Sequence, residues 1–222
     1  MGANRDQFAL IENISAISGE AAADLRETLD KIVAAIAEGM EVEVCSLYLF
    51  DPQRERLVLR ATIGLDRDSV GKVSMRQNEG LVGMVIEKGE AVGVTDAISH
   101  PRYKYFPETG EERYHTFLGV PVQDGRNKPI GVLVVQTLTR RKFTKSEARL
   151  LKTAANQVAS DALSNFLASS AVNPLMLGRT LAAGSLPDFD SMTSAPFPNN
   201  ITLIFLFASY YFRSCYEIRT VG

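Results

Sequence analysis

A loop rich in tyrosines and cationic side chains carries the residue types best suited to binding a small molecule. It runs over residues 99–117 as SHPRYKYFPETGEERYHTF. The guanidinium group of Arg113 offers paired N–H donors for a planar carboxylate, and Tyr114 and Phe117 offer apolar rings that keep water from such a contact. These residue types favour a ligand with a carboxylate or an amide, which leaves many amino and keto acids open.

Two polar residues just before this loop extend the candidate site. Residues 92–94, Val-Gly-Val, are typical of a short strand, and Thr95 and Asp96 follow at its end, where ligand contacts are common. Their side chains can bind amine or hydroxyl groups. The sequence therefore predicts a ligand site made of Thr95, Asp96, Arg113, Tyr114 and Phe117.

The length of the loop also indicates a role in binding. Connections above about 12 residues inside a compact domain are usually functional or disordered. Five aromatic rings in this loop can bury enough area to order it, so we expect a folded lid over a small-molecule pocket. The alternative is an ordinary loop whose tyrosines pack at the rim while its charges stay in water.

Neither catalysis nor a metal site is predicted. His100 and His115 are the two histidines of the chain, and neither lies in a hydrolase or zinc-protease motif. Cys45 and Cys215 form neither a disulfide framework nor a zinc motif. We therefore expect Cys45 to be structural, and we expect the chain to work without a cofactor in the reducing cytoplasm.

Charge and hydropathy argue against two classes of partner. The net charge of −2 gives no basic field for nucleic acid. The longest apolar run, residues 201–212, is well short of the ~20 residues that span a bilayer as a helix. The N-terminal residues MGANRDQFALIENI carry charges where a secretion signal needs an apolar core. We expect neither nucleic acid nor membrane as a partner.

Two hairpins should supply the strands that position the loop. Residues 117–136, FLGVPVQDGRNKPIGVLVVQ, alternate around a glycine-containing turn, and the second strand is apolar on both faces, so it should be central in its sheet. Residues 44–50 and 57–63 form the other hairpin. In its second strand four apolar residues are expected on one face, namely Leu57, Leu59, Ala61 and Ile63.

Helical periodicity appears before and after the strands. Narrow apolar stripes run through residues 5–17, 25–36 and 151–166, and Thr144 and Glu147 fit a capping box at the start of the last helix. A short helix is expected over residues 80–88, ending at Gly89. The stripes either cover one face of the sheet or join two copies of the chain, and we predict a homodimer through the flanking helices.

In this order the elements resemble those of a GAF domain, a sensory module. The resemblance rests on FLGVPV, IGVLVV and the following helix start FTKSEARLL. It implies an α+β fold, with an antiparallel sheet of five or six strands, helices on one face and a ligand pocket on the other. The implied organisation is an N-terminal helix over residues 1–19, a GAF domain over 20–167, and a linker and apolar tail over 168–222.

A narrower resemblance suggests a biological context. The stretches IAEGMEVEVCSLYLFD, NEGLVGMVIEKGEAV and VTDAISHPRY resemble the N-terminal regulatory GAF domain of the nitrogen-pathway phosphoenolpyruvate-protein phosphotransferases. This resemblance implies that the domain senses glutamine or α-ketoglutarate. No histidine follows Phe166, so this chain cannot carry the phosphohistidine of such an enzyme. The expected function is non-catalytic sensing, and the rival is a dimerisation module whose pocket is filled by its own side chains.

We predict that a chain ending at Ala168 folds without the tail, because the apolar periodicity and helix caps are complete by Phe166. Thermal unfolding followed by circular dichroism should give one cooperative transition, as for the full chain. A broad, non-cooperative transition would make the tail part of the core.

Overall fold

The computed structural model describes residues 2–19, 25–51 and 53–169 of the 222-residue chain. Residues 1–162 form one compact unit and residues 163–222 a second. Most of the predicted linker and apolar tail, residues 170–222, lies outside the described residues.

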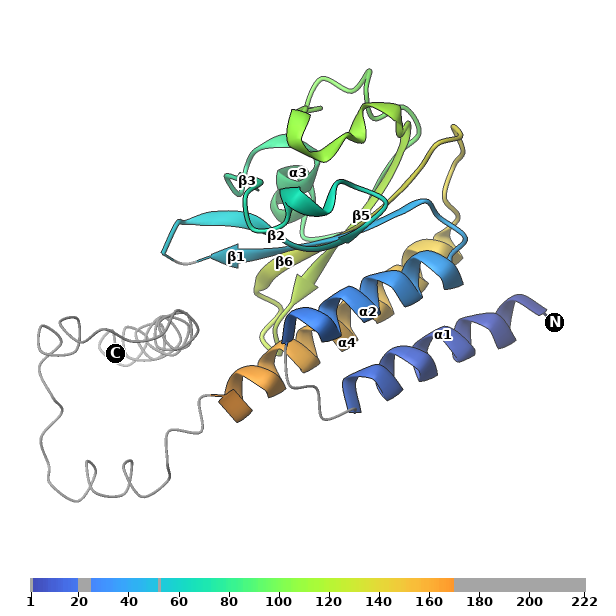
Figure 1. Ribbon diagram of the computed structural model, residues 1–222. Coiled ribbons are helices and arrows are strands. Elements are labelled where there is room, and N and C mark those ends of the chain that lie inside the picture. The colour runs from blue at the N-terminus through green and yellow to red at the C-terminus, as the bar shows by residue number, and fades with distance from the viewer. Residues whose placement is uncertain (1, 20–24, 52, 170–222) are drawn as a thin grey trace, which may run out of the picture. The chain divides into compact units, whose positions relative to one another are not determined.

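Six strands form one antiparallel sheet in the order β3-β2-β1-β6-β5-β4 (Figure 1). They are β1 (Val44–Asp51), β2 (Arg56–Ile63), β3 (Ser74–Met75), β4 (Val92–Val94), β5 (Thr116–Gln123) and β6 (Pro129–Thr137). β6 lies between β1 and β5, and all its residues after Pro129 are buried. The predicted central position of this strand is confirmed.

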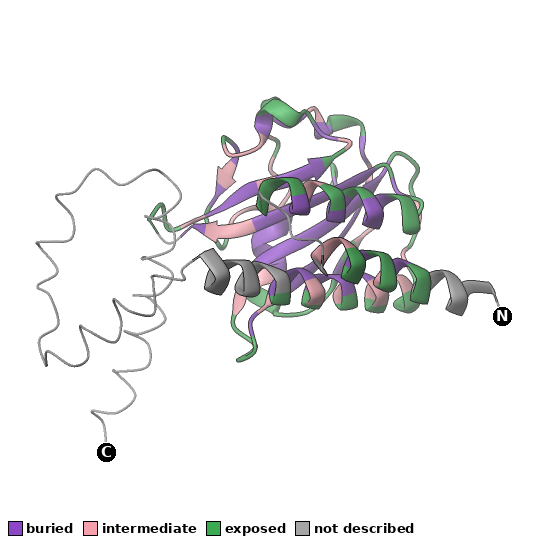
Figure 2. Cartoon of the chain, turned by 60° about the horizontal axis from the view of Figure 1, so that its bottom comes forward, coloured by how far each residue is buried: buried purple, intermediate pink, exposed green. Residues whose placement is uncertain are grey.

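Two helices, α2 (Leu25–Gly39) and α4 (Lys145–Ser169), cover one face of the sheet, and α1 (Gly2–Gly19) packs against α2 on the side away from the sheet (Figure 1). The short helix α3 (Gly80–Lys88) lies on the other face. Figure 2 shows the buried sheet behind helices whose outward surfaces are exposed. No helix within the described ranges is both long and apolar enough to cross a bilayer. The predicted α+β arrangement is confirmed.

The apolar stripes of the helices are used within a single chain. Ile32 and Ile36 of α2 and Leu151 and Val158 of α4 are fully buried in one core with the sheet. Since burial of apolar area is the main gain in such packing, these stripes need no second copy to cover them. Of the two roles predicted for the stripes, these residues fill the first, which is to cover one face of the sheet.

A β-bulge overturns one detail of the strand prediction. The register between β1 and β2 shifts after Leu47, which leaves Arg60 as an extra residue in β2. As a result Leu57 and Leu59 pack on the α3 face, whereas Ala61 packs under the long helices. The prediction that one face carries Leu57, Leu59, Ala61 and Ile63 is therefore wrong. The Arg60 guanidinium group lies 3.0 Å from the Asp51 carboxylate.

α3 packs closely on the sheet because a glycine lies beneath it. A Cβ atom at Gly119 of β5 would lie 2.7 Å from the Val85 side chain. Gly89 ends the helix in the left-handed conformation, with φ of 64°, and its N–H donates to the Val85 carbonyl, as predicted for that glycine. This approach makes α3 one wall of the space on this face.

Candidate functional site

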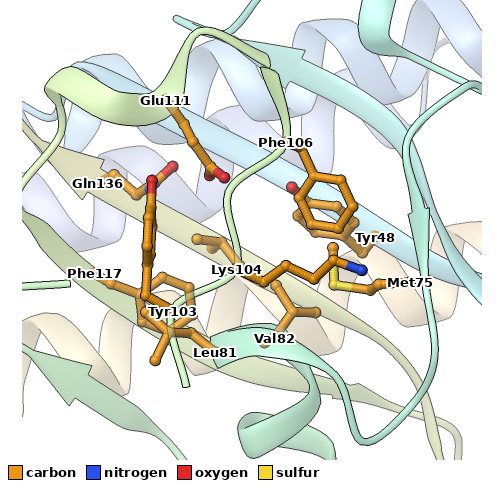
Figure 3. A pocket seen from close by; sticks show the side chains of 12 residues that line it. Tyr48, Met75, Leu81, Val82, Tyr103, Lys104, Phe106, Glu111, Phe117 and Gln136 are labelled. Carbon is orange, nitrogen blue, oxygen red and sulfur yellow. The ribbon is translucent and has the colours of Figure 1, made fainter. Parts of the chain in front are cut away.

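A small cavity lies on the face of the sheet opposite the long helices. Its volume is about 30 Å³, room for one or two water molecules. The sheet forms its floor, α3 forms a side wall, and residues 103–111 form its roof (Figure 3). The lining residues are Tyr48, Met75, Gly80, Leu81, Val82, Tyr103, Lys104, Phe106, Glu111, Phe117, Val134 and Gln136.

Polar groups gather at one end of this mostly apolar cavity. Glu111 enters from the roof, and its side chain accepts hydrogen bonds from the Phe106 backbone N–H and from the Gln136 side chain on β6. The Tyr103 hydroxyl is buried at the same end and has no hydrogen-bond partner within the part of the chain that the structure describes. A small number of convergent polar groups in an otherwise apolar cavity is typical of a small-molecule site.

The Glu111 carboxyl group is the most perturbed acid in the cavity. It is only 9% exposed, and burial raises its pKa from 4.5 to about 7 despite the two hydrogen bonds, with a smaller contribution from the neighbouring charge of Glu112. Burial likewise raises the pKa of Tyr48 and Tyr103, so both phenols stay protonated near neutral pH. The site therefore holds one group, Glu111, whose charge changes near neutral pH.

Ion pairs fasten the roof to the start and end of α3. The Lys104 ammonium lies 2.5 Å from Glu79, the residue before the helix, and 4.8 Å from the centre of the Phe106 ring. Arg102 pairs with Glu87 on α3 and donates to the Asn78 carbonyl at 2.6 Å. These partly exposed contacts hold the roof closed while remaining sensitive to salt.

Of the five residues predicted from the sequence, Phe117 lines the cavity and the other four do not. Tyr114 is buried elsewhere, where its hydroxyl donates to the Gly64 carbonyl at 2.7 Å. Arg113 is exposed and donates to the Tyr114 hydroxyl at 2.8 Å. The structure thus gives Arg113 and Tyr114 a different role, which is to fix the end of the roof segment.

Thr95 and Asp96 lie at the other end of the loop. The Asp96 carboxylate pairs with Arg140 at 3.0 Å and accepts a hydrogen bond from Ser99 at 3.0 Å. Its second oxygen is buried without a partner among the described residues. The Thr95 side chain is exposed. Neither residue contributes to the cavity with Phe117.

Sequence reasoning missed most of the cavity because its polar residues come from separate elements. The strand pattern held one clue, since Gln136 is a polar residue on the same face of a fully buried strand as Val132 and Val134. The roof belongs to the loop that was predicted to form a lid, but a loop has no periodicity from which to predict which of its side chains point into the cavity. Glu111 could not be distinguished from Glu112 by residue type alone.

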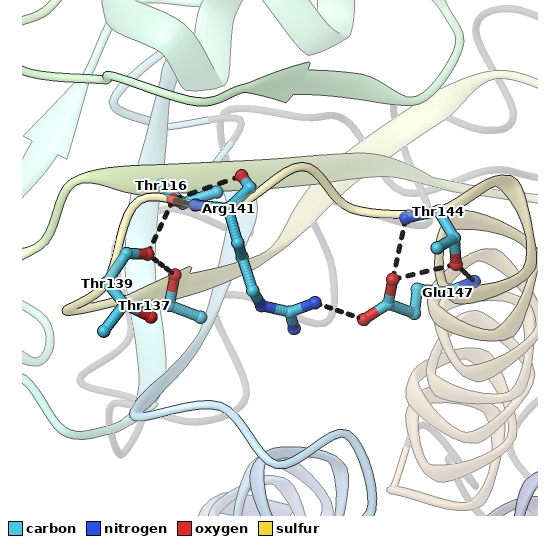
Figure 4. Close-up of polar contacts among 6 residues, drawn as sticks. All are labelled: Thr116, Thr137, Thr139, Arg141, Thr144 and Glu147. Atoms are coloured by element: carbon cyan, nitrogen blue, oxygen red, sulfur yellow. Dashed lines mark hydrogen bonds and ion pairs between the residues drawn. The ribbon is translucent and has the colours of Figure 1, made fainter.

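A hydrogen-bonded junction connects the cavity floor to α4 (Figure 4). Phe117 pairs with Gln136 across β5 and β6, and the next pair along is Thr116 with Thr137. The Thr116 hydroxyl donates to the Thr139 carbonyl at 3.0 Å and accepts from the Arg141 backbone N–H at 3.0 Å. The floor of the cavity is therefore one residue away from a network that leads out of the sheet.

The same network ends at the start of α4. The Arg141 guanidinium group lies 2.6 Å from the Glu147 carboxylate. Glu147 accepts from the Thr144 backbone N–H at 2.7 Å, and its own N–H donates to the Thr144 hydroxyl at 3.2 Å. The predicted capping box is confirmed, and caps of this type contribute roughly 0.5–2 kcal/mol.

The other candidate reactive groups are placed for structural roles. Cys45 is fully buried in the helix-side core, and burial raises the pKa of its thiol, so it is a poor nucleophile, in line with the prediction. His100 accepts a hydrogen bond from the Arg102 backbone N–H at 3.1 Å. Within the described residues no cluster of potential metal ligands is found.

Domains similar to this one occur in known proteins. The family model described as "GAF domain" matches residues 24–161. The phosphoenolpyruvate-dependent phosphotransferase system protein of Escherichia coli is 41% identical over 135 residues, which cover 61% of this chain and 18% of that protein. The chain thus spans about a fifth of the length of the curated relative it matches.

A solved structure and a second relative extend the comparison. The GAF domain of a phosphoenolpyruvate-protein phosphotransferase from Coxiella burnetii is 33% identical, with a TM-score of 0.69, and the match covers 78% of this chain and all of that one. A Nif-specific regulatory protein from Klebsiella oxytoca is 25% identical, over 76% of this chain and 32% of that protein.

The raised pKa of Glu111 predicts that the free energy of unfolding depends on pH. In the unfolded chain the carboxyl group titrates near 4.5, and in the folded chain near 7, so the folded state holds its proton to higher pH. The contribution of Glu111 is therefore most favourable below pH 4.5 and is lost as pH rises to about 7, by about 3 kcal/mol in all.

Glu111→Gln should remove this pH dependence. We expect the free energy of unfolding of the variant, relative to the unchanged chain, to rise by up to about 3 kcal/mol between pH 4 and pH 8, as measured by urea denaturation. Glu112→Gln, at an exposed neighbouring position, is the matched control and should show no such rise. Parallel pH curves for Glu111→Gln and the unchanged chain would contradict the prediction.

Proposed function

Because the chain belongs to the GAF domain family, we propose that it is a non-catalytic sensory module that binds a small metabolite in the cavity beneath residues 103–111. The observation that carries this proposal is the convergence of Glu111, Gln136 and the unpartnered Tyr103 hydroxyl in an otherwise apolar cavity. Buried polar groups without hydrogen-bond partners are rare in folded proteins. A ligand that bonds to the Tyr103 hydroxyl would supply the partner that this group lacks.

The proposed ligand is glutamine or α-ketoglutarate. These are the metabolites implied by the resemblance to the nitrogen-pathway phosphotransferases, and both carry polar groups at two ends of a short carbon chain. In the cavity, the apolar rings of Phe106 and Phe117 would contact the chain, while Glu111 and Gln136 would contact one polar end. A ligand of this size needs the roof to move, because the closed cavity is about 30 Å³.

Regulation of an attached phosphotransferase is the proposed use of this binding, in the cytoplasm and in nitrogen signalling. It is supported by the similarity to the GAF domain of a phosphoenolpyruvate-protein phosphotransferase and to a Nif-specific regulatory protein. The junction from Thr116 through Arg141 to Glu147 offers a physical route by which movement of the floor reaches α4.

A second candidate is a dimerisation module that binds no ligand. It is favoured by the small size of the cavity, which Tyr103, Lys104 and Phe106 nearly fill. In that case the roof would stay closed over Glu111 at every ligand concentration. The two functions differ in whether any metabolite binds.

Binding is tested by calorimetry on the full chain with glutamine and with α-ketoglutarate. We expect at least one of them to bind, and Gln136→Leu to weaken that binding roughly tenfold or more, because the amide lines the cavity. Arg113→Ala should bind as the unchanged chain does, because its guanidinium group lies outside the cavity. A loss of about 1.5–3 kcal/mol in Arg113→Ala would instead support the site predicted from the sequence.

We also propose a homodimer through the flanking helices. The residues available for it are Phe8 on α1, which is 70% exposed, and Leu25 on α2, which is 41% exposed. Analytical ultracentrifugation at high micromolar concentration should show a dimer, and Phe8→Glu should weaken it. A monomer under these conditions would remove dimerisation from the proposal.

A further inference from the structure

Glu111 is a buried acid whose charge nothing in the cavity balances. Its side chain is nine-tenths buried, and no cation is among the groups that shift its titration. The cation that lines the cavity, Lys104, is paired with Glu79 at 2.5 Å on the far side of the roof. A buried carboxylate without a counter-charge is strongly disfavoured, so the free site lacks a positive group.

The hydrogen-bonding capacity around this carboxyl group is also incomplete. An ionised carboxylate has about four acceptor positions, and Glu111 uses two, for the Phe106 N–H and the Gln136 amide. When Gln136 donates through its NH₂ group, its carbonyl oxygen is left as an acceptor. The Tyr103 hydroxyl, buried and unpartnered, is the third oxygen at this end of the cavity.

We propose that Glu111, Gln136 and Tyr103 together form a subsite for the ammonium group of an amino acid. An ammonium group carries one positive charge and three N–H donors, and it meets three oxygens here. The inference rests on the proposed function, because it assigns the class of metabolite that the same cavity takes. It favours glutamine over α-ketoglutarate, since a second carboxylate placed beside Glu111 would be repelled.

Size and position agree with an ammonium group at this end. The closed cavity of about 30 Å³ has room for a head group of that size, while the rest of the ligand would displace the roof near Lys104 and Phe106. Displacing Lys104 from Glu79 would free a cation at the cavity rim. That cation could then pair with the carboxylate of the same amino acid.

Binding of a cation should also depend on pH. The groups that face Glu111 are Tyr48 from β1, Tyr103 and Glu112 from the roof, and Gln136 from β6. Both phenols are uncharged near neutrality, and Gln136 does not titrate. Because the carboxyl group must lose its proton to meet an ammonium group, the affinity should be about tenfold lower at pH 6 than at pH 8.

The test compares two ligands that differ only in the ammonium group, L-glutamine and its des-amino analogue glutaramate. Calorimetry on the full chain at pH 8 should give at least tenfold tighter binding of L-glutamine. Glu111→Gln should reduce the affinity for L-glutamine about 10- to 100-fold and so abolish the preference for L-glutamine over glutaramate. Glu112→Gln is the matched control, and its preference should equal that of the unchanged chain.

The possible contrary results separate the ammonium subsite from the sensory function. Equal binding of both ligands, a preference that survives Glu111→Gln, or tighter binding of α-ketoglutarate than of L-glutamine would overturn the ammonium subsite and leave the sensory function standing. If the unchanged chain bound none of L-glutamine, glutaramate and α-ketoglutarate, both the ammonium subsite and the proposed sensory function would be overturned. Thermal unfolding of each variant checks that a lost preference does not reflect lost structure.

Discussion

β6 is buried on both of its faces, with Val135 in the core under the long helices and Val134 in the core under α3. A strand with no face in water needs cover on each side, and here the two covers differ in kind. On one side, long helices supply continuous apolar stripes that pack against residues such as Val135. On the other side, α3 and an irregular roof meet Val134, and between them they leave a small space with polar groups. The site is thus a consequence of covering one face with a short helix and a loop instead of long helices.

The chemistry of that space follows from a balance of two effects on Glu111. Desolvation disfavours its charge, whereas the hydrogen bonds from the Phe106 backbone and from Gln136 favour it, and desolvation is the larger effect. A purely structural position would be filled more stably by an apolar residue, because hydrophobic replacements of buried charges are often neutral or stabilising. A titratable group kept at such a position is a reason to look for a ligand there.

The sequence predicted the parts of the fold that depend on regular periodicity. The alternation of β6 and the capping box of Thr144 follow from local rules, and both are confirmed. The bulge at Arg60 was missed because one inserted residue changes the face of every later side chain without altering the composition of the strand.

The site was less predictable for a related reason. Arg113 and Tyr114 have the right chemistry for a ligand, but they fix the roof to the Gly64 carbonyl at the end of β2. Glu111, a few residues earlier, turns inward because the short helical turns of the roof set its direction. Residue type identified the correct segment, and only the three-dimensional path of that segment identified the side chains.

The metabolite proposed for this protein would occupy the space between the sheet and the roof. A crystal structure of the chain grown with saturating L-glutamine would show whether that space is filled. We expect ligand density bounded by Phe117, Gln136 and Glu111, with the Lys104–Phe106 segment displaced outward from its present position. Density for water alone, beneath a roof that has not moved, would contradict it.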